Sequence, residues 1–212
     1  MLIKPRMRGR LHEIAFFVSV PAGIALIALA HTGKARLAAS VFAVGLAGVF
    51  GASAAYHRIG WSDPARRRMK RLDHSMIFVL IAGTYTPLCL LALSGAWSVA
   101  ILATVWAGAI TGIVLKQVSI DGLKRLSGFL YIALGWASIV ALPQLFHSLS
   151  TASFVLVVAG GLLYTLGAIV FATKRPDPNP AVFGYHEIWH VFTTSAGVCH
   201  YLAVLLLVLA VH

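Results

Sequence analysis

The stretch Tyr185-His186-Glu187-Ile188-Trp189-His190 opens the last long apolar segment of this chain. In a helix, two histidines four residues apart lie on the same face, one turn above the other. Ionisable side chains inside an apolar segment must be paired or desolvated at a cost, so they usually mark a functional site. The stretch therefore predicts a membrane helix that carries a functional site near its first turn.

The composition of the whole chain is that of a membrane protein. Of its 212 residues, 59% are hydrophobic and 11% are charged, whereas about a quarter of the residues in average globular proteins are charged. A helix needs about 20 apolar residues to cross a bilayer. Seven segments approach or exceed this length, approximately at residues 13–32, 37–59, 73–93, 96–115, 126–146, 152–173 and 185–210. We therefore predict an all-α, polytopic membrane protein whose seven transmembrane helices form a single domain over residues 1–212.

The basic residues predict the orientation of the seven helices. Of the 17 Lys and Arg residues, all but Lys34 and Arg36 lie in the N-terminal stretch or in the loops after the second, fourth and sixth segments. Because Lys and Arg collect in short cytoplasmic loops, we expect the N-terminus in the cytoplasm and the C-terminus outside, in the plasma (inner) membrane. The same rule explains the net charge of +11 without a nucleic-acid partner.

The N-terminal stretch also has the outline of a signal peptide, since basic residues precede an apolar run. That run extends from Ile14 to Ala30, which is longer than the ~7–15 apolar residues of a usual signal peptide. We therefore expect it to be retained as the first helix.

With this orientation, three segments bring ionisable residues to the cytoplasmic leaflet. His57 ends the second segment, Asp73 opens the third, and His186 and His190 lie in the first turns of the seventh. Three imidazoles suit a Zn²⁺ ion, which in catalytic sites commonly takes three protein ligands and leaves the fourth position to water. Asp73 could then hold this water or remove its proton. Ser53, one turn before His57, could orient that imidazole or donate to a developing oxyanion.

Simpler interpretations of the same residues remain open. His186 and His190 could be polar residues of the membrane interface, and His57 could complement the helix dipole at a helix end. Asp73 could be a salt-bridge partner of the nearby basic residues, or an N-cap, because it opens its segment. His186 to His190 also fits the HExxH pattern of zinc metalloproteases, in which Glu187 would be the general base. Glu187, however, points away from the face that the two histidines share.

The remaining histidines are not predicted to bind the metal. His12, His31, His147 and His212 lie at segment ends and are expected at the membrane interface. His200 lies ten residues beyond His190, about 15 Å deeper along a helix. We expect it to be a hydrogen-bonding residue of the core.

Three motifs resemble those of the bacterial haemolysin III-like proteins. They are Ser53-Ala-Ala-Tyr-His57, Arg71-Leu-Asp73-His74-Ser75 with the run to Pro87, and Gly184-Tyr-His186-Glu187-Ile-Trp-His190. These proteins are grouped with the progestin and adipoQ receptor family, which includes the adiponectin receptors, in a superfamily that also contains alkaline ceramidases. The resemblance covers all seven segments and implies a seven-helix fold with the N-terminus inside. It also implies a zinc site formed by His57, His186 and His190, with Asp73 and Ser53 as the family's aspartate and serine. Glu187 is not among the residues that the superfamily shares.

The residues and the resemblance together favour a zinc-dependent integral membrane hydrolase. Its substrate would be a lipid amide or ester in the bilayer, as in ceramidases, and its activity would influence membrane lipid homeostasis. Three alternatives remain: a non-enzymatic sensor or regulator of the membrane state with a structural zinc ion, a haemolytic pore-forming protein, and an intramembrane HExxH metalloprotease.

Overall fold

The computed structural model describes residues 5–211, without the side chains of Lys124 and Arg125. Lys4, one of the basic residues used to predict the orientation, and His212, expected at the interface, lie outside this range. The described part contains seven helical spans long and apolar enough to cross a membrane. Its ordered elements are helices, apart from an isolated β-bridge between Asn179 and Phe183. The predicted fold class, an all-α protein with seven membrane spans, is therefore confirmed.

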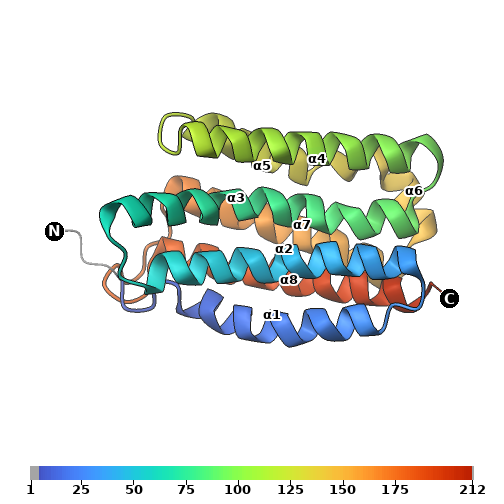
Figure 1. The fold of residues 1–212 in the computed structure, drawn as a ribbon, viewed down its shortest axis with the longest axis horizontal. Helices are drawn as coiled ribbons and strands as arrows, with labels where there is room; N and C mark the ends of the chain where they lie inside the picture. The colour runs from blue at the N-terminus through green and yellow to red at the C-terminus, as the bar shows by residue number, and fades with distance from the viewer. Residues whose placement is uncertain (1–4, 212) are drawn as a thin grey trace.

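The helices run lengthwise beside one another as a bundle (Figure 1). Their bounds are α1 Arg10–Ala28, α2 Gly33–Arg58, α3 Asp63–Pro87, α4 Gly95–Val118, α5 Lys124–Gly135, α6 Leu142–Ser148, α7 Thr151–Thr173 and α8 Tyr185–Leu209. A π-helical turn, Leu88–Ala92, continues α3, and a 3₁₀ segment, Ala137–Ala141, joins α5 to α6. The end of α2 and the beginnings of α1, α3 and α8 lie at the same end of the bundle (Figure 1).

Helix α3 begins ten residues earlier than the apolar pattern predicts, at Asp63 instead of Asp73. Ser62 is the N-cap residue and Pro64 occupies the first turn, where its missing N–H group is not needed. The Arg and Lys residues that follow are good helix formers, although they are too polar to belong to the membrane span. Asp73 consequently lies about three turns inside the helix, and its interpretation as an N-cap is wrong.

The fifth span is not one continuous helix. It breaks after Gly135, and α6 carries Pro143 in its first turn. A break frees backbone groups that must find partners inside the membrane. The Tyr85 hydroxyl donates to the carbonyl of Gly135 at 2.8 Å and accepts from the backbone N–H of Ser138 at 2.9 Å. A side chain of α3 therefore satisfies the interrupted backbone.

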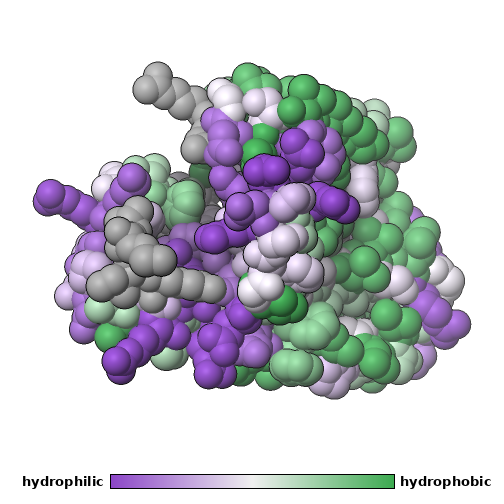
Figure 2. Space-filling model, turned by 60° about the vertical axis from the view of Figure 1, so that its left-hand side comes forward, coloured by the Kyte–Doolittle hydropathy of each residue, from purple (hydrophilic) through white to green (hydrophobic). Residues whose placement is uncertain are grey.

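Small residues allow the helices to pack closely inside the bundle. A Cβ atom at Gly108 would meet Leu134, and one at Gly112 would meet the ring of Phe78, which is fully buried. The Gly108–Gly112 pair therefore serves close packing within the bundle. The outer surface carries apolar side chains along the flank, whereas hydrophilic residues gather at the end of the bundle where α2 ends and α3 begins (Figure 2).

Candidate metal centre

Three histidines from two helices form a compact cluster at one end of the bundle. His57 belongs to the last turn of α2, and His186 and His190 belong to the first two turns of α8. One nitrogen from each ring lies within 4.8 Å of the other two. The ring centroids are separated by 4.9 Å for His57–His186, 5.4 Å for His57–His190 and 4.7 Å for His186–His190. The three side chains that the sequence predicts as ligands are thus brought together in space.

The first turn of α8 is held by Glu187, which lies between the two histidines. One oxygen of its carboxylate accepts a hydrogen bond from the backbone N–H of Gly184 at 2.8 Å and so caps the helix. The other oxygen forms an ion pair with Arg8, and the Glu187 side chain is only 3% exposed. Glu187 is therefore engaged in holding α8 in place, which counts against its use as the general base of a metalloprotease.

Asp73 and Ser53 face each other across α2 and α3. The buried Ser53 hydroxyl interacts with the Asp73 carboxylate, and Ser53 lies one turn before His57 on α2. The Asp73 carboxylate is not one of the ligand atoms that gather within 4.8 Å of one another. The structure therefore connects Asp73 to the histidine cluster through Ser53, and leaves the carboxylate outside the set of candidate ligands.

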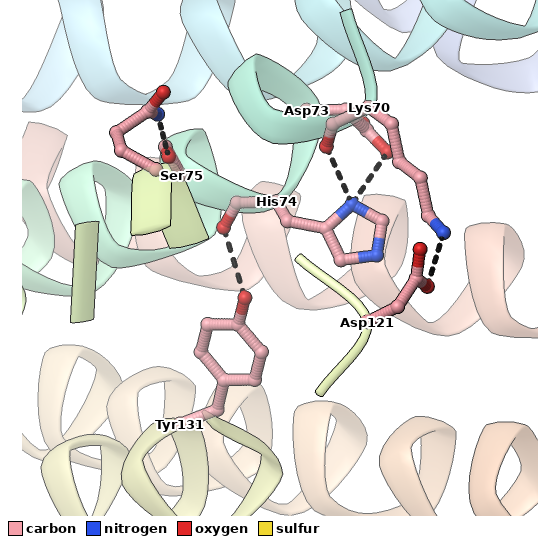
Figure 3. Close-up of polar contacts among 7 residues, drawn as sticks. Lys70, Asp73, His74, Ser75, Asp121 and Tyr131 are labelled. Carbon is pink, nitrogen blue, oxygen red and sulfur yellow. Dashed lines mark hydrogen bonds and ion pairs between the residues drawn. The ribbon is translucent and has the colours of Figure 1, made fainter. Parts of the chain in front are cut away.

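His74, the neighbour of Asp73 in the sequence, is held by partners outside the histidine cluster (Figure 3). Its Nδ1 atom lies 2.8 Å from the carbonyl oxygen of Lys70 and 3.6 Å from a carboxylate oxygen of Asp73. Its own carbonyl accepts a hydrogen bond from the Tyr131 hydroxyl at 2.9 Å, and Lys70 donates to Asp121 at 2.7 Å (Figure 3). These contacts tie the beginning of the membrane span in α3 to α5 and to the loop before it.

A fourth histidine, which the sequence interpretation missed, lies against the cluster. His12 was expected at the membrane interface, but it is buried, with 4% of its surface exposed. Its ring stacks on that of His190, with centroids 3.8 Å apart and planes inclined by 12°. The physical reason is that the first turn of α1 packs against α8 and is therefore shielded from the membrane surface. His12 has the same predicted depth as the other three histidines, and this depth was the signal that could have identified it.

The residues before α1 contact both helices that carry the histidine cluster and the segment that precedes α8. The backbone N–H groups of Arg6 and Met7 donate to the carbonyls of Ala181 and Val182 at 3.0 and 3.1 Å. Gly9 adopts a left-handed conformation (φ 80°), and a Cβ atom there would lie 2.7 Å from the Cβ atom of His57. Together with the Arg8–Glu187 ion pair, these contacts join the N-terminal segment to both helices that carry the histidine cluster.

The other described histidines lie away from the cluster or on the surface. His200 is buried, and its Nε2 atom lies 3.3 Å from the carbonyl oxygen of Val157. It is thus a hydrogen-bonding core residue, as the sequence predicts. His31 and His147 are exposed at the ends of their segments, in agreement with an interfacial position.

Comparison with known proteins gives matches over nearly the whole chain. The family model described as "Haemolysin-III related" matches residues 1–201. The chain is 36% identical to "Hemolysin-3" of Bacillus cereus over 201 residues, which cover 93% of this chain and 89% of that protein. It is 34% identical to the "Hemolysin-3 homolog" of Bacillus subtilis (strain 168) over 197 residues, 92% of this chain and 89% of the relative. It is also 25% identical to the human "Monocyte to macrophage differentiation factor" over 195 residues, 89% and 79% of the two chains.

Proposed function

This chain belongs to the haemolysin-III-related family of multi-pass membrane proteins, and from its histidine cluster we propose that it is a zinc-dependent hydrolase of a lipid amide or ester. The observation that carries the proposal is the convergence of three imidazoles from α2 and α8 at one point of the bundle. Basic residues gather at the same end, so we place the site near the cytoplasmic leaflet of the plasma membrane.

The donor set suits zinc. Neutral imidazoles carry no charge before the metal binds, so they are less costly to bury than carboxylates or thiolates. Tetrahedral coordination with Zn–N bonds of ~2.1 Å requires nitrogens ~3.4 Å apart, and small ring rotations would bring the three nitrogens, now within 4.8 Å, to that separation. Three protein ligands leave one position open, as in catalytic zinc sites. His57, His186 and His190 are therefore the residues that would hold the ion.

The polar groups beside the cluster supply the remaining chemistry. A zinc ion in this position would act as a Lewis acid toward a substrate carbonyl and a nearby water. The Asp73 carboxylate, whose side chain is 14% exposed, would accept the proton that this water loses as it attacks the carbonyl carbon. The Ser53 hydroxyl would hold the carboxylate in position through the contact that it already makes. The apolar flank of the bundle would keep the substrate's lipid chains in the bilayer.

The proposal is tested with purified protein in detergent or lipid nanodiscs. Metal content is measured by elemental analysis, and products are screened by mass spectrometry on ceramide-like amides and on ester lipids. We expect His190→Ala to lose the metal and the activity. Asp73→Asn should retain the metal and lose turnover by roughly 100-fold or more, while the exposed carboxylate variant Asp121→Asn should match the wild type. Full hydrolysis by metal-free His190→Ala would refute the mechanism.

A non-enzymatic regulator with a structural metal ion is the second candidate. It is favoured by the position of Asp73, whose carboxylate lies outside the group of candidate ligand atoms. In this case Asp73→Asn would preserve the effect of the protein on its membrane.

A membrane-lysing activity of this protein is suggested only by the names of two bacterial relatives. Conductance measurements with the purified protein in liposomes test it.

A further inference from the structure

We propose that His12 is a positioning residue of the metal centre, which fixes the ring of His190 in the orientation that binds the ion. This inference rests on the proposed function, because it assigns a role toward the same metal. It adds a residue from α1 to a site otherwise built from α2 and α8.

The first support is the enclosure of the His12 ring. On one side it stacks on His190, with centroids 3.8 Å apart and planes inclined by 12°. Phe50 of α2 lies next to it as well, with ring centroids 5.1 Å apart. His12 is 4% exposed and His190 is 2% exposed, so neither ring is free to rotate into solvent. The stack consequently limits rotation of the His190 ring about its side-chain bonds.

The second support is that the Thr193 hydroxyl contacts both the His12 ring and the backbone of His190. The Thr193 hydroxyl donates to the carbonyl oxygen of His190 at 3.1 Å. The same hydroxyl lies 3.0 Å from His12 Nε2, within hydrogen-bond distance. His12 thus holds His190 both through its ring and through the backbone of the same residue.

The geometry excludes His12 as a ligand of the same ion as His190. An imidazole binds a metal through a lone pair that lies in the plane of its ring. Two nearly parallel rings stacked 3.8 Å apart direct their lone pairs along separate, nearly parallel planes. One ion at ~2.1 Å cannot lie in both planes. His12 therefore acts on the metal only through His190.

The segment before α1 keeps His12 in this place. Arg8 is paired with Glu187, and Gly9 packs against His57. The ring that orients His190 thus belongs to α1, and the segment before α1 is fixed by its own contacts with α2 and α8. A ligand that is already oriented loses less rotational freedom when the metal binds, so affinity is higher. Partners that orient a metal ligand are typically worth about 10–100-fold in metal affinity.

The experiment measures zinc affinity by competition with a chromophoric chelator, and the visible spectrum of the protein loaded with Co²⁺. His12→Ala removes both the stack and the hydrogen bond, and should weaken zinc binding by about 10–100-fold and change the Co²⁺ spectrum. Leu26→Ala is the matched control, because Leu26 is a fully buried residue of the same helix that lies about 20 Å along the axis from His12. It should lower overall stability and leave both readouts at the wild-type value.

Two further variants test the role of His12 if His12→Ala does not fold. His12→Phe keeps an aromatic ring beside His190 and loses the hydrogen bond, and Thr193→Val removes the hydroxyl. Each should shift the Co²⁺ spectrum and weaken zinc binding by less than the full effect, about tenfold at most.

Wild-type affinity and spectrum in the folded His12 variants would overturn the inference, and so would an equal loss in Leu26→Ala. Neither result would affect the proposed function, because the wild type would still bind zinc through its three histidines. A wild-type protein that binds no divalent metal would overturn both.

Discussion

Replacing Glu187 with glutamine separates its structural contacts from any part in catalysis. The Glu187 carboxylate caps α8 through Gly184 and pairs with Arg8. Glutamine retains a carbonyl oxygen that can still accept the 2.8 Å bond from the Gly184 N–H group, but it loses the charge. Because the HExxH mechanism requires a carboxylate base at this position, the same substitution would abolish activity if the chain were such a protease.

The expected loss of stability follows from the burial of the pair. Removing one partner of a buried ion pair costs about 3–5 kcal/mol. Arg8 is 20% exposed and can turn partly toward water, so we expect Glu187→Gln to destabilise the protein by about 2–3 kcal/mol. Arg8→Met leaves the Glu187 carboxylate, 3% exposed, without its counter-charge and should cost the full ~3–5 kcal/mol. The double variant should recover most of the loss, since the pair is then replaced by neutral groups.

The assay is reversible unfolding in mixed detergent micelles, combined with zinc content and lipid turnover of the folded protein. Glu13→Gln is the control, because Glu13 pairs with Arg58 at 3.2 Å and is 34% exposed. It should cost less than ~1 kcal/mol. Wild-type stability together with abolished turnover and retained zinc in Glu187→Gln would refute this reasoning, and would establish Glu187 as a base.

Three further predictions concern backbone geometry, a buried hydroxyl and the metal. Gly9→Ala places a Cβ atom 2.7 Å from that of His57 on a left-handed backbone (φ 80°). It should destabilise the protein by about 2–4 kcal/mol and increase hydrogen exchange at residues 5–12. In the control Gly33→Ala the new Cβ atom meets open space, so protection from exchange should not change. Tyr164→Phe should be neutral or stabilising in thermal unfolding, because the buried hydroxyl has no hydrogen-bond partner among the described residues; a loss above ~1 kcal/mol would show that it has one. A chelator should lower the melting temperature of the wild type and leave that of His190→Ala unchanged, since metal that binds only the folded state stabilises it; equal shifts in both would contradict a metal held by this cluster.

The sequence predicted the seven spans and the meeting of His57, His186 and His190 because depth in a membrane is a one-dimensional property. Segment lengths and the positions of Lys and Arg are sufficient to estimate it. By the same reasoning His12, which follows the basic N-terminal stretch, belongs at this depth. The expectation that a residue near the end of a segment faces water fails for His12, because the His190 ring covers it.

Other features do not follow from hydropathy and charge, because they depend on helix boundaries or on contacts between distant residues. Hydropathy marks where a helix enters the membrane, whereas the start of α3 is signalled by Ser62 at the N-cap and Pro64 in the first turn, which an apolar pattern does not include. The Arg8–Glu187 pair joins residues 179 positions apart, and a single sequence contains no signal for such a pairing. The orientation of the bundle in the membrane stays a prediction from charge.

The stacking of His12 on His190 also has a consequence for biosynthesis. The first of these residues lies on α1, whereas the second lies on α8 and enters the membrane only after the other described helices have been made. Membrane helices insert individually and associate afterwards. A nascent chain that ends before α8 holds only one of the three candidate ligands. If these histidines hold the proposed ion, metal occupancy would report that α8 has joined the bundle. Chains stalled or truncated before α8 should then remain metal-free and be distinguishable by that property from chains that contain it.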